Sequence, residues 1–115
     1  MPTYLLLLHS DESRFQGHSP EEIQGIYMRY RRWREEIIAK GVHNGGNKLR
    51  DASGRVMRQS AGKLVVTDGP YAETREVLGG YFQITADDYE QAVEIAKSCP
   101  HLDFGTIEIR EIEKT

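Results

Sequence analysis

The stretch that decides the fold is Tyr4-Leu5-Leu6-Leu7-Leu8 (YLLLL, residues 4–8), close to the start of the chain. Successive side chains of a β-strand point to opposite faces of a sheet, so a run without polar positions supplies apolar side chains to both faces. We therefore predict a strand over residues 3–9, in the middle of a sheet that is covered on both sides. The polar residues from His9 onward end this strand.

A long helix signal comes next. Ser19 can act as the N-cap, Pro20 suits the first helical position, and Glu22 stands where the second partner of a capping box stands. The apolar residues that recur at helical spacing are Ile23, Ile26, Tyr27, Tyr30, Trp33, Ile37 and Ile38. Gly41 suits the left-handed residue that follows a helix. The pattern predicts a helix over about residues 20–40.

The middle of the chain reads as short strands. Residues 55–59 and 63–67 have β character and flank Ser60-Ala61-Gly62, a spacing that predicts a hairpin with a three-residue loop. A further short strand is expected at residues 47–50, after a glycine-rich passage.

The last third repeats the strand–helix–strand pattern. A strand is expected over residues 80–86, followed by a helix that begins at Asp87 with Glu90 as its capping-box partner. Pro100 ends this helix. Residues 105–112 alternate between apolar and charged side chains and predict the final strand.

This order of elements predicts one domain over residues 1–115 with an α+β fold. Two helices separated by strands, each able to pack on a sheet, indicate a ferredoxin-like sandwich of the dimeric α/β-barrel type, with both helices on an antiparallel sheet. Helices on one face leave the other face bare, and the run Leu5 to Leu8 supplies apolar side chains to both. We therefore expect a homodimer in which a second copy covers that face.

Composition restricts the partners. The net charge is −3 and the chain is mildly acidic, so nucleic acid is an unexpected partner. No apolar run reaches the roughly 18 residues of a membrane span, and no signal peptide is recognisable, so we expect no membrane association. The single cysteine, Cys99, allows no internal disulfide and suits a cytoplasmic location.

The longest motif is TDGPYAETREVLGG, residues 67–80. A plain connection needs about four to six residues, so its length raises the question of whether it is a site or only a loop. Gly79 and Gly80 most simply let the backbone turn into the next strand. A phosphate cradle is the weaker alternative, because no helix begins directly after them.

The part of this motif from Asp68 to Glu76, followed by Leu78-Gly79-Gly80-Tyr81, resembles the signature of the DGPF group in the YCII-related family. The strand at residues 4–8, the helix start at residues 19–22 and Ser98-Cys99-Pro100-His101 fit the same family. The resemblance covers essentially the whole chain. It implies a ferredoxin-like fold that is usually dimeric, with a biochemical role that is largely unsettled.

The resemblance also implies two kinds of function. Some relatives are proposed to be small enzymes with a His–Asp pair in a cleft, and others accompany extracytoplasmic-function sigma factors. In this chain Asp68 matches the aspartate, but Tyr30 stands where those relatives place the histidine, and Arg75 replaces the usual lysine. An acid–base mechanism carried over from the relatives therefore lacks one partner.

We interpret the candidate residues on that basis. The catalytic candidates are Asp68, Tyr30 and His9, which lies at a strand end that would border a cleft; the candidate ligand-binding residues are Tyr71, Arg34, Arg75, Gly69 and Pro70. Each also has a structural explanation. Asp68 can cap its own turn, Tyr30 can be a core residue, and Arg75 can belong to a solvated loop.

Other chemistry has less support. The arginines at positions 29, 31, 32 and 34 can pair with nearby glutamates, as Arg32 can with Glu36, so a self-neutralised helix face is expected. No two of the four histidines stand at metal-ligand spacing, and Cys99 lies on a buried stripe. We expect neither a metal nor another cofactor.

Two functions remain open at this point. One is a cofactor-free enzyme that performs proton transfer or lyase chemistry on a small molecule bound near the Asp68-Gly69-Pro70-Tyr71 motif. The other is a non-catalytic regulatory or partner-binding module, associated with an extracytoplasmic-function sigma factor. The residues do not identify a substrate.

Overall fold

A computed structural model of the chain describes residues 1–11, 13–70 and 76–114. The first strand, β1 (Thr3–Asp11), begins at the predicted residue and extends two residues beyond the predicted end. Its side chains alternate between buried and half-buried along the whole strand. Leu6 and Leu8 therefore face the core, and Leu5 and Leu7 face the other side of the sheet.

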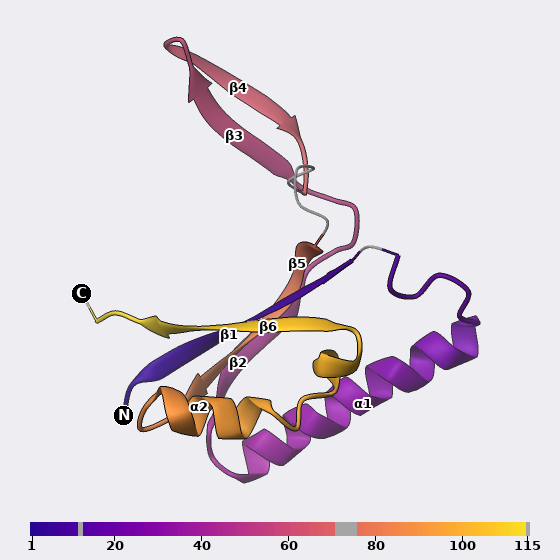
Figure 1. Cartoon of the computed structure of the whole chain (residues 1–115), viewed down its shortest axis with the longest axis vertical. Coiled ribbons are helices and arrows are strands. Elements are labelled where there is room, and N and C mark those ends of the chain that lie inside the picture. Colours follow the sequence, from indigo (N-terminus) through magenta and orange to yellow (C-terminus); the bar gives the residue numbers. More distant parts are fainter. Residues whose placement is uncertain (12, 71–75, 115) are drawn as a thin grey trace.

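The main sheet has four strands in the order β2–β5–β1–β6. The other three are β2 (His43–Lys48), β5 (Glu76–Thr85) and β6 (Gly105–Ile112), and every neighbouring pair is antiparallel. β1 is thus a central strand, as its apolar run predicted. This order, with the helices packed on one side, is the ferredoxin-like α+β arrangement (Figure 1).

The first helix, α1 (Pro20–Ala39), ends one residue before the predicted end. Its capping box is present: the Ser19 side chain accepts a hydrogen bond from the Glu22 backbone N–H, and the Glu22 carboxylate accepts one from the Ser19 N–H. Gly41 follows with a φ of 75°. None of the described helices is long and apolar enough to cross a membrane.

The second helix, α2 (Tyr89–Ala96), is capped one residue later than predicted. Asp88 is its N-cap, and the Asp88 carboxylate accepts a hydrogen bond from the Gln91 backbone N–H. The predicted cap at Asp87 is therefore wrong by one position. A 3₁₀ turn, η1 (Pro100–Asp103), then leads into β6.

The core lies between the sheet and the two helices. Trp33 of α1 packs edge-on against Phe82 of β5 at a ring-centroid distance of 5.1 Å, and its indole N–H donates to the Ser98 hydroxyl. The other buried members of the core are Tyr4, Leu6, Leu8, Ile37, Ile84, Ala86, Ala92, Ala96 and Cys99. Only one part of the predicted apolar stripe of α1 is fully buried, and Tyr27 and Ile38 are exposed.

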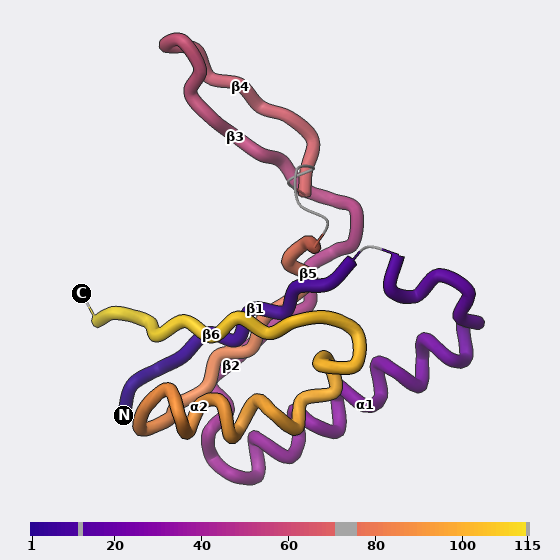
Figure 2. The backbone as a smooth tube through the Cα atoms, in the orientation of Figure 1, coloured from indigo at the N-terminus to yellow at the C-terminus, as the bar shows by residue number. Residues whose placement is uncertain are grey.

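The predicted hairpin forms a separate two-stranded sheet of β3 (Arg55–Ser60) and β4 (Lys63–Asp68). Ser60 pairs with Lys63, so the loop has two residues and not the predicted three. We call the hairpin the arm, residues 55–68. It projects away from the body, to which it is joined at one end only (Figures 1 and 2). The arm raises the radius of gyration to 16.1 Å, where a compact chain of this length would have about 13 Å.

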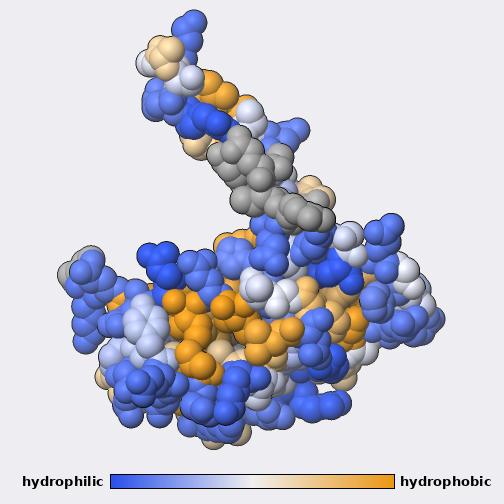
Figure 3. All heavy atoms as spheres, in the orientation of Figure 1, coloured by the Kyte–Doolittle hydropathy of each residue, from blue (hydrophilic) through white to orange (hydrophobic). Residues whose placement is uncertain are grey.

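One face of the arm is apolar. Met57 lies directly opposite Val66, and Leu64 is two residues from Val66 on the same face. These three side chains are between 52% and 65% exposed, and orange apolar atoms are visible on the arm in Figure 3. A two-stranded hairpin is marginally stable by itself in water, so this face lacks the packing partner that such a hairpin needs.

The sheet face that points away from the helices is also open. Leu7 of β1 lies opposite Tyr81 of β5, and Leu5 lies opposite Gln83. Both leucines are only half-buried, because no described element of the chain covers this face. The prediction that a second copy covers it stays a prediction.

Candidate functional site

A cavity of about 240 Å³ lies between α1 and the helix-facing side of the sheet, next to η1. We call it the α1 pocket. Gly80, which lines it, occupies the helix-facing row of β5, where Phe82 and Ile84 fill the next two positions with large side chains. A Cβ at position 80 would lie 3.0 Å from the backbone oxygen of Asn47, so Gly80 allows β2 to approach closely beside the pocket.

The strand around Gly80 differs from the prediction. Leu8 pairs with Gly80 but His9 pairs with Leu78, so Gly79 is an extra residue that forms a β-bulge. β5 begins at Glu76, so the two glycines lie inside a strand. The interpretation of Gly79-Gly80 as a turn into the strand was wrong, because the strand begins before them.

The pocket wall is strongly cationic. Four basic side chains line it, Arg14, Arg31, Arg34 and Lys48, and none of the described lining residues carries a carboxylate. Among the described residues, Arg31 and Arg34 form no ion pair with a carboxylate, which corrects the expected self-neutralised helix face. Arg29 of α1, in contrast, forms an ion pair with Asp103, with 2.6 Å between the guanidinium nitrogen and the carboxylate oxygen.

Arg14 and Lys48 are held in place by one acid outside the pocket. Asp51 lies 3.3 Å from the Arg14 guanidinium and 3.3 Å from the Lys48 ammonium. Although burial acts to raise it, the pKa of Asp51 is lowered by these two hydrogen-bonded cations. Arg14 also stacks over the ring of Phe15, with 4.5 Å between the guanidinium carbon and the ring centroid. The side chain of Arg14 is only 11% exposed.

Aromatic rings form much of the remaining wall. The aromatic residues of the pocket wall on the helix-facing side of the sheet are Phe15, Tyr27, Tyr30 and Phe82. Phe15 anchors this group, because it contacts Tyr27 and Phe104 edge-on at 5.9 Å each. The pocket therefore combines an apolar interior with positive charge, which suits a ligand that has a ring and an anionic group.

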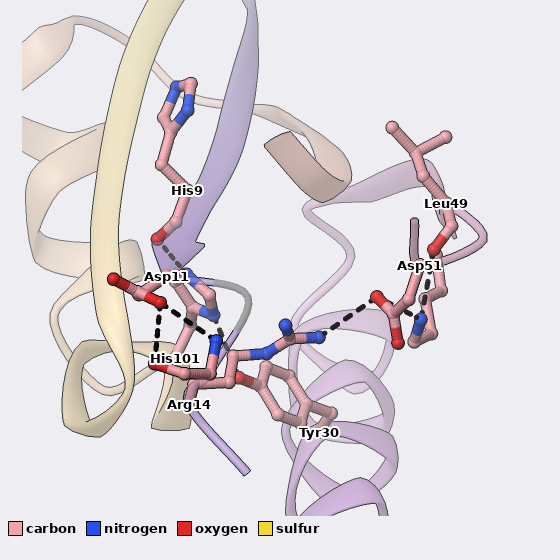
Figure 4. Close-up of polar contacts among 9 residues, drawn as sticks. His9, Asp11, Arg14, Tyr30, Leu49, Asp51 and His101 are labelled. Carbon is pink, nitrogen blue, oxygen red and sulfur yellow. Dashed lines mark hydrogen bonds and ion pairs between the residues drawn. The ribbon is translucent and has the colours of Figure 1, made fainter. Parts of the chain in front are cut away.

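Tyr30 and His101 form the polar centre of the pocket. The Tyr30 hydroxyl lies 2.8 Å from Nδ1 of His101, and Nε2 of His101 lies 2.8 Å from the backbone oxygen of His9 (Figure 4). Burial lowers the pKa of His101 and raises the pKa of Tyr30. Both groups are therefore neutral near pH 7.

Gly105 makes this arrangement possible. A Cβ at position 105 would overlap the backbone oxygen of His9, and it would lie 2.9 Å from Nε2 of His101. Any larger residue would have to displace the imidazole or the β1–β6 pairing. The hydrogen bond between His101 and His9 thus depends on the absence of a side chain at the first residue of β6.

Among the described residues, the α1 pocket brings together two of the predicted site residues. Tyr30 and Arg34 both line the α1 pocket. His9 contributes its backbone oxygen, but its side chain points away from Tyr30 and bonds to Glu108 at 3.0 Å on the open face (Figure 4). The roles predicted for these side chains are untested by this geometry.

The Asp68 motif lies elsewhere. Asp68 ends β4 in the arm, where its side chain is 92% exposed and lies 3.3 Å from Arg55. Gly69 donates its backbone N–H to the oxygen of Gly54 at the base of the arm, and the Gly69–Pro70 peptide bond is cis. The predicted ligand-binding residues Tyr71 and Arg75 lie outside the described residues.

A second, wider hollow separates the arm base from the body. Its volume is about 840 Å³, and Pro70 and His9 both line it, together with Glu76 and Leu78. It is the only described place where the Asp68 motif and another predicted residue border the same space. Arg14 and Phe15 line both hollows.

Sequence reasoning missed the residues that complete the α1 pocket. In the sequence, His101 stands out only as part of the segment Ser98-Cys99-Pro100-His101, which fits the family, and neither Arg14 nor Lys48 belongs to a recognisable motif. No spacing signal connects them, because Tyr30 and His101 are 71 residues apart. Among the described residues, no group of three potential ligands stands ready for a metal ion. Cys99 is buried, and burial raises the pKa of its thiol to about 11.

Two comparisons with known proteins bear on this chain. The family of the YCII-related domain matches residues 3–115. An uncharacterized protein of Rhizobium meliloti (strain 1021) is 27% identical over 112 residues, which cover 95% of this chain and 90% of that protein. Neither description names an activity.

Proposed function

We propose, from the premise that this chain belongs to the YCII-related domain family, that it binds a small organic anion in the α1 pocket. The observation that carries this proposal is the charge of the wall. In the described part of the chain, four cations and no carboxylate line this cavity, although the net charge of the protein is −3. Arginine guanidinium groups bind carboxylates and phosphates through paired hydrogen bonds, which favours such a group in the ligand.

The aromatic wall defines the rest of the ligand. Rings such as Phe15 and Phe82 offer apolar contact to a flat or unsaturated body. The volume of about 240 Å³ is small for a binding site, so the ligand is a metabolite rather than a cofactor-sized molecule. A ring that carries one carboxylate combines these properties.

The proposal is tested with phenylpyruvate, which has a ring and a carboxylate, and with phenylacetone, which has the same ring and carbonyl group but no carboxylate. Binding is followed by NMR titration of the protein. We expect phenylpyruvate to shift signals of the pocket and phenylacetone to bind at least about 10-fold more weakly, because it forms no charge-assisted hydrogen bonds.

Arg34→Gln should weaken phenylpyruvate binding by about 10-fold or more, since it removes a pocket cation without a carboxylate partner. Arg32→Gln is the matched control, because Arg32 lies on the same helix but does not line the pocket. Equal binding of the charged and uncharged compounds would overturn the proposal. So would equal losses in the two variants.

We further propose that the chain acts as a homodimer. Two apolar surfaces favour a second copy: the half-buried leucines on the open sheet face and the apolar face of the arm. Leu7→Lys places a charge in the open face and should give a monomer at micromolar concentration in analytical ultracentrifugation. Gln24→Lys, on the exposed side of α1, should leave the dimer intact. A monomeric wild type would overturn this part.

In such a dimer the arm offers Asp68 to a cleft between copies. The exposed carboxylate of Asp68 supports this role, because its own chain leaves it accessible to a ligand or to a second copy. Tyr71 and Arg75, the next residues of the motif, would line the same cleft in our proposal, as would His9 from the wider hollow.

A second candidate function is a non-catalytic module that binds a protein partner, such as an extracytoplasmic-function sigma factor. The exposed apolar face of the arm favours it, because surfaces of this kind mark interaction sites. A different substitution should abolish each of the two functions. Loss of partner binding in Leu64→Lys but not in Arg34→Gln would support the second.

A further inference from the structure

The hydroxyl of Tyr30 lies between the α1 pocket and the imidazole of His101. Both residues line the pocket, and the hydroxyl oxygen is 2.8 Å from Nδ1 of His101. On the far side of the ring, Nε2 lies 2.8 Å from the His9 backbone oxygen. The imidazole is therefore held at both nitrogens, one of which faces Tyr30.

The direction of these two hydrogen bonds follows from elementary chemistry. A backbone carbonyl oxygen only accepts hydrogen bonds, so Nε2 of His101 must carry the hydrogen. In a neutral imidazole the other nitrogen, Nδ1, then has a free lone pair and accepts the hydrogen of the Tyr30 hydroxyl. The lone pairs of the Tyr30 oxygen remain available on the side of the pocket.

We propose that Tyr30 and His101 form a proton relay that interconverts keto and enol forms of an organic anion with an acidic C–H beside a carbonyl group. This inference rests on the proposed binding of such an anion in the α1 pocket. Tyr30 touches the substrate, and His101 accepts the proton that Tyr30 passes on.

The step balances without another reactant. The C–H bond of the substrate breaks, and its proton moves to the Tyr30 oxygen while the Tyr30 hydrogen moves to Nδ1 of His101. The electron pair of that bond forms the C=C bond, and the carbonyl oxygen becomes an oxyanion. The proton then returns through Tyr30 to this oxygen, which gives the enol and restores both side chains. The reverse sequence gives the keto form.

The surroundings favour the charges that develop. Two cations line the same cavity as Tyr30: Arg34, and Arg14, whose side chain lies beside Tyr30 in Figure 4 with its guanidinium directed at Asp51. Positive groups that are already in place stabilise an oxyanion without reorganisation. The His9 oxygen stabilises the imidazolium that forms at His101, because it accepts the Nε2 hydrogen in both protonation states.

The first test is the tautomer of His101. In long-range ¹H–¹⁵N NMR spectra at pH 7, we expect the neutral form with hydrogen on Nε2. A hydrogen on Nδ1, or a doubly protonated ring, would overturn the relay, because neither leaves a lone pair to accept the Tyr30 hydrogen. This measurement needs no ligand, so it tests the relay separately from the binding proposal.

The second test uses phenylpyruvate in D₂O. NMR measures the exchange of its C3 hydrogens for deuterium, and titration measures binding in the same samples. We expect the wild type to accelerate exchange. Tyr30→Phe, which keeps the ring, should lower the protein-catalysed rate by at least about 100-fold while phenylpyruvate still binds. The glutamine side chain of His101→Gln can still donate a hydrogen bond to the His9 oxygen but has no basic nitrogen. This variant should therefore also bind phenylpyruvate and show a similarly reduced exchange rate.

Tyr89→Phe is the matched control. It removes a tyrosine hydroxyl that accepts a hydrogen bond from the Glu111 backbone N–H, outside the pocket, so the exchange rate should stay the same. Binding without exchange in the wild type would overturn the relay and leave the binding proposal standing. An absence of binding at millimolar phenylpyruvate would overturn both.

Discussion

The hydroxyl oxygen of Tyr30 and Nδ1 of His101 lie 2.8 Å apart although the residues are 71 positions apart in the chain. Tyr30 belongs to α1 and His101 to η1, two elements that are distant in the sequence but in contact in the fold. The sheet order places β1 beside β6, so the turn before β6 meets the helix that follows β1. This contact gives the α1 pocket its only described histidine, and the predictions below test what depends on it.

Gly105→Ala should disrupt this contact. The added Cβ would overlap the His9 oxygen and crowd Nε2 of His101, so we expect the free energy of unfolding to fall by about 2 kcal/mol or more. Gly25→Ala is the control, because a Cβ there meets no atom within 4 Å and helix propensity favours alanine. Chemical denaturation measures both. Equal stabilities of the two variants would contradict the role of Gly105.

The stability of the protein should depend on His101 between pH 5.5 and 7.5. Burial lowers the pKa of His101 below its ordinary value of 6.5 in the folded chain. As the pH falls through 6.5, the unfolded chain binds a proton that folded His101 does not bind, so the free energy of unfolding decreases.

Denaturant titrations at several pH values check this dependence. His101→Gln should show a shallower decrease than the wild type. Some decrease will remain, because burial and the charge of Arg34 also lower the pKa of His43. Identical slopes in both proteins would show that His101 protonates equally in the folded and unfolded chains.

The apolar face of the arm should be required for assembly. Met57→Lys places a charge at a side chain that is 65% exposed, so it should cost the monomer less than about 0.5 kcal/mol while it weakens a dimer that buries this face. Arg58→Gln changes the opposite face of the same strand and serves as the control. Sedimentation equilibrium measures the dissociation constant. An unchanged constant in Met57→Lys would place the arm outside the interface.

Asp68→Asn should change ligand binding more than stability. Its side chain is almost fully exposed and its ion pair with Arg55 lies at the surface, so we expect a stability change within about 0.5 kcal/mol. If the arm contributes Asp68 to a cleft of the dimer, phenylpyruvate affinity will change at protein concentrations that favour the dimer. An unchanged affinity there would remove Asp68 from the site.

Local interactions explain why most of the fold could be read from the sequence. The Ser19 capping box and the two strands of the hairpin depend on neighbours a few residues away, and they lie within one residue of their predicted positions. β2 and β5 each begin four residues before the strands that were predicted there. The apolar run at residues 4–8 placed β1 at the centre of the sheet because both of its faces carry apolar side chains. The family resemblance pointed to the same fold.

Tertiary packing decided the candidate site. Tyr30 and Arg34 could be named in advance because both lie on one helix, but the approach of His101 and Arg14 depends on how β1, β6 and α1 pack together. Gly80 and Gly105 matter because a Cβ at either position would crowd neighbouring atoms of the folded chain. The sequence does not show which atoms those are. A pocket is built from residues that are close only after folding, so its charge and its hydrogen bonds belong to the assembled fold.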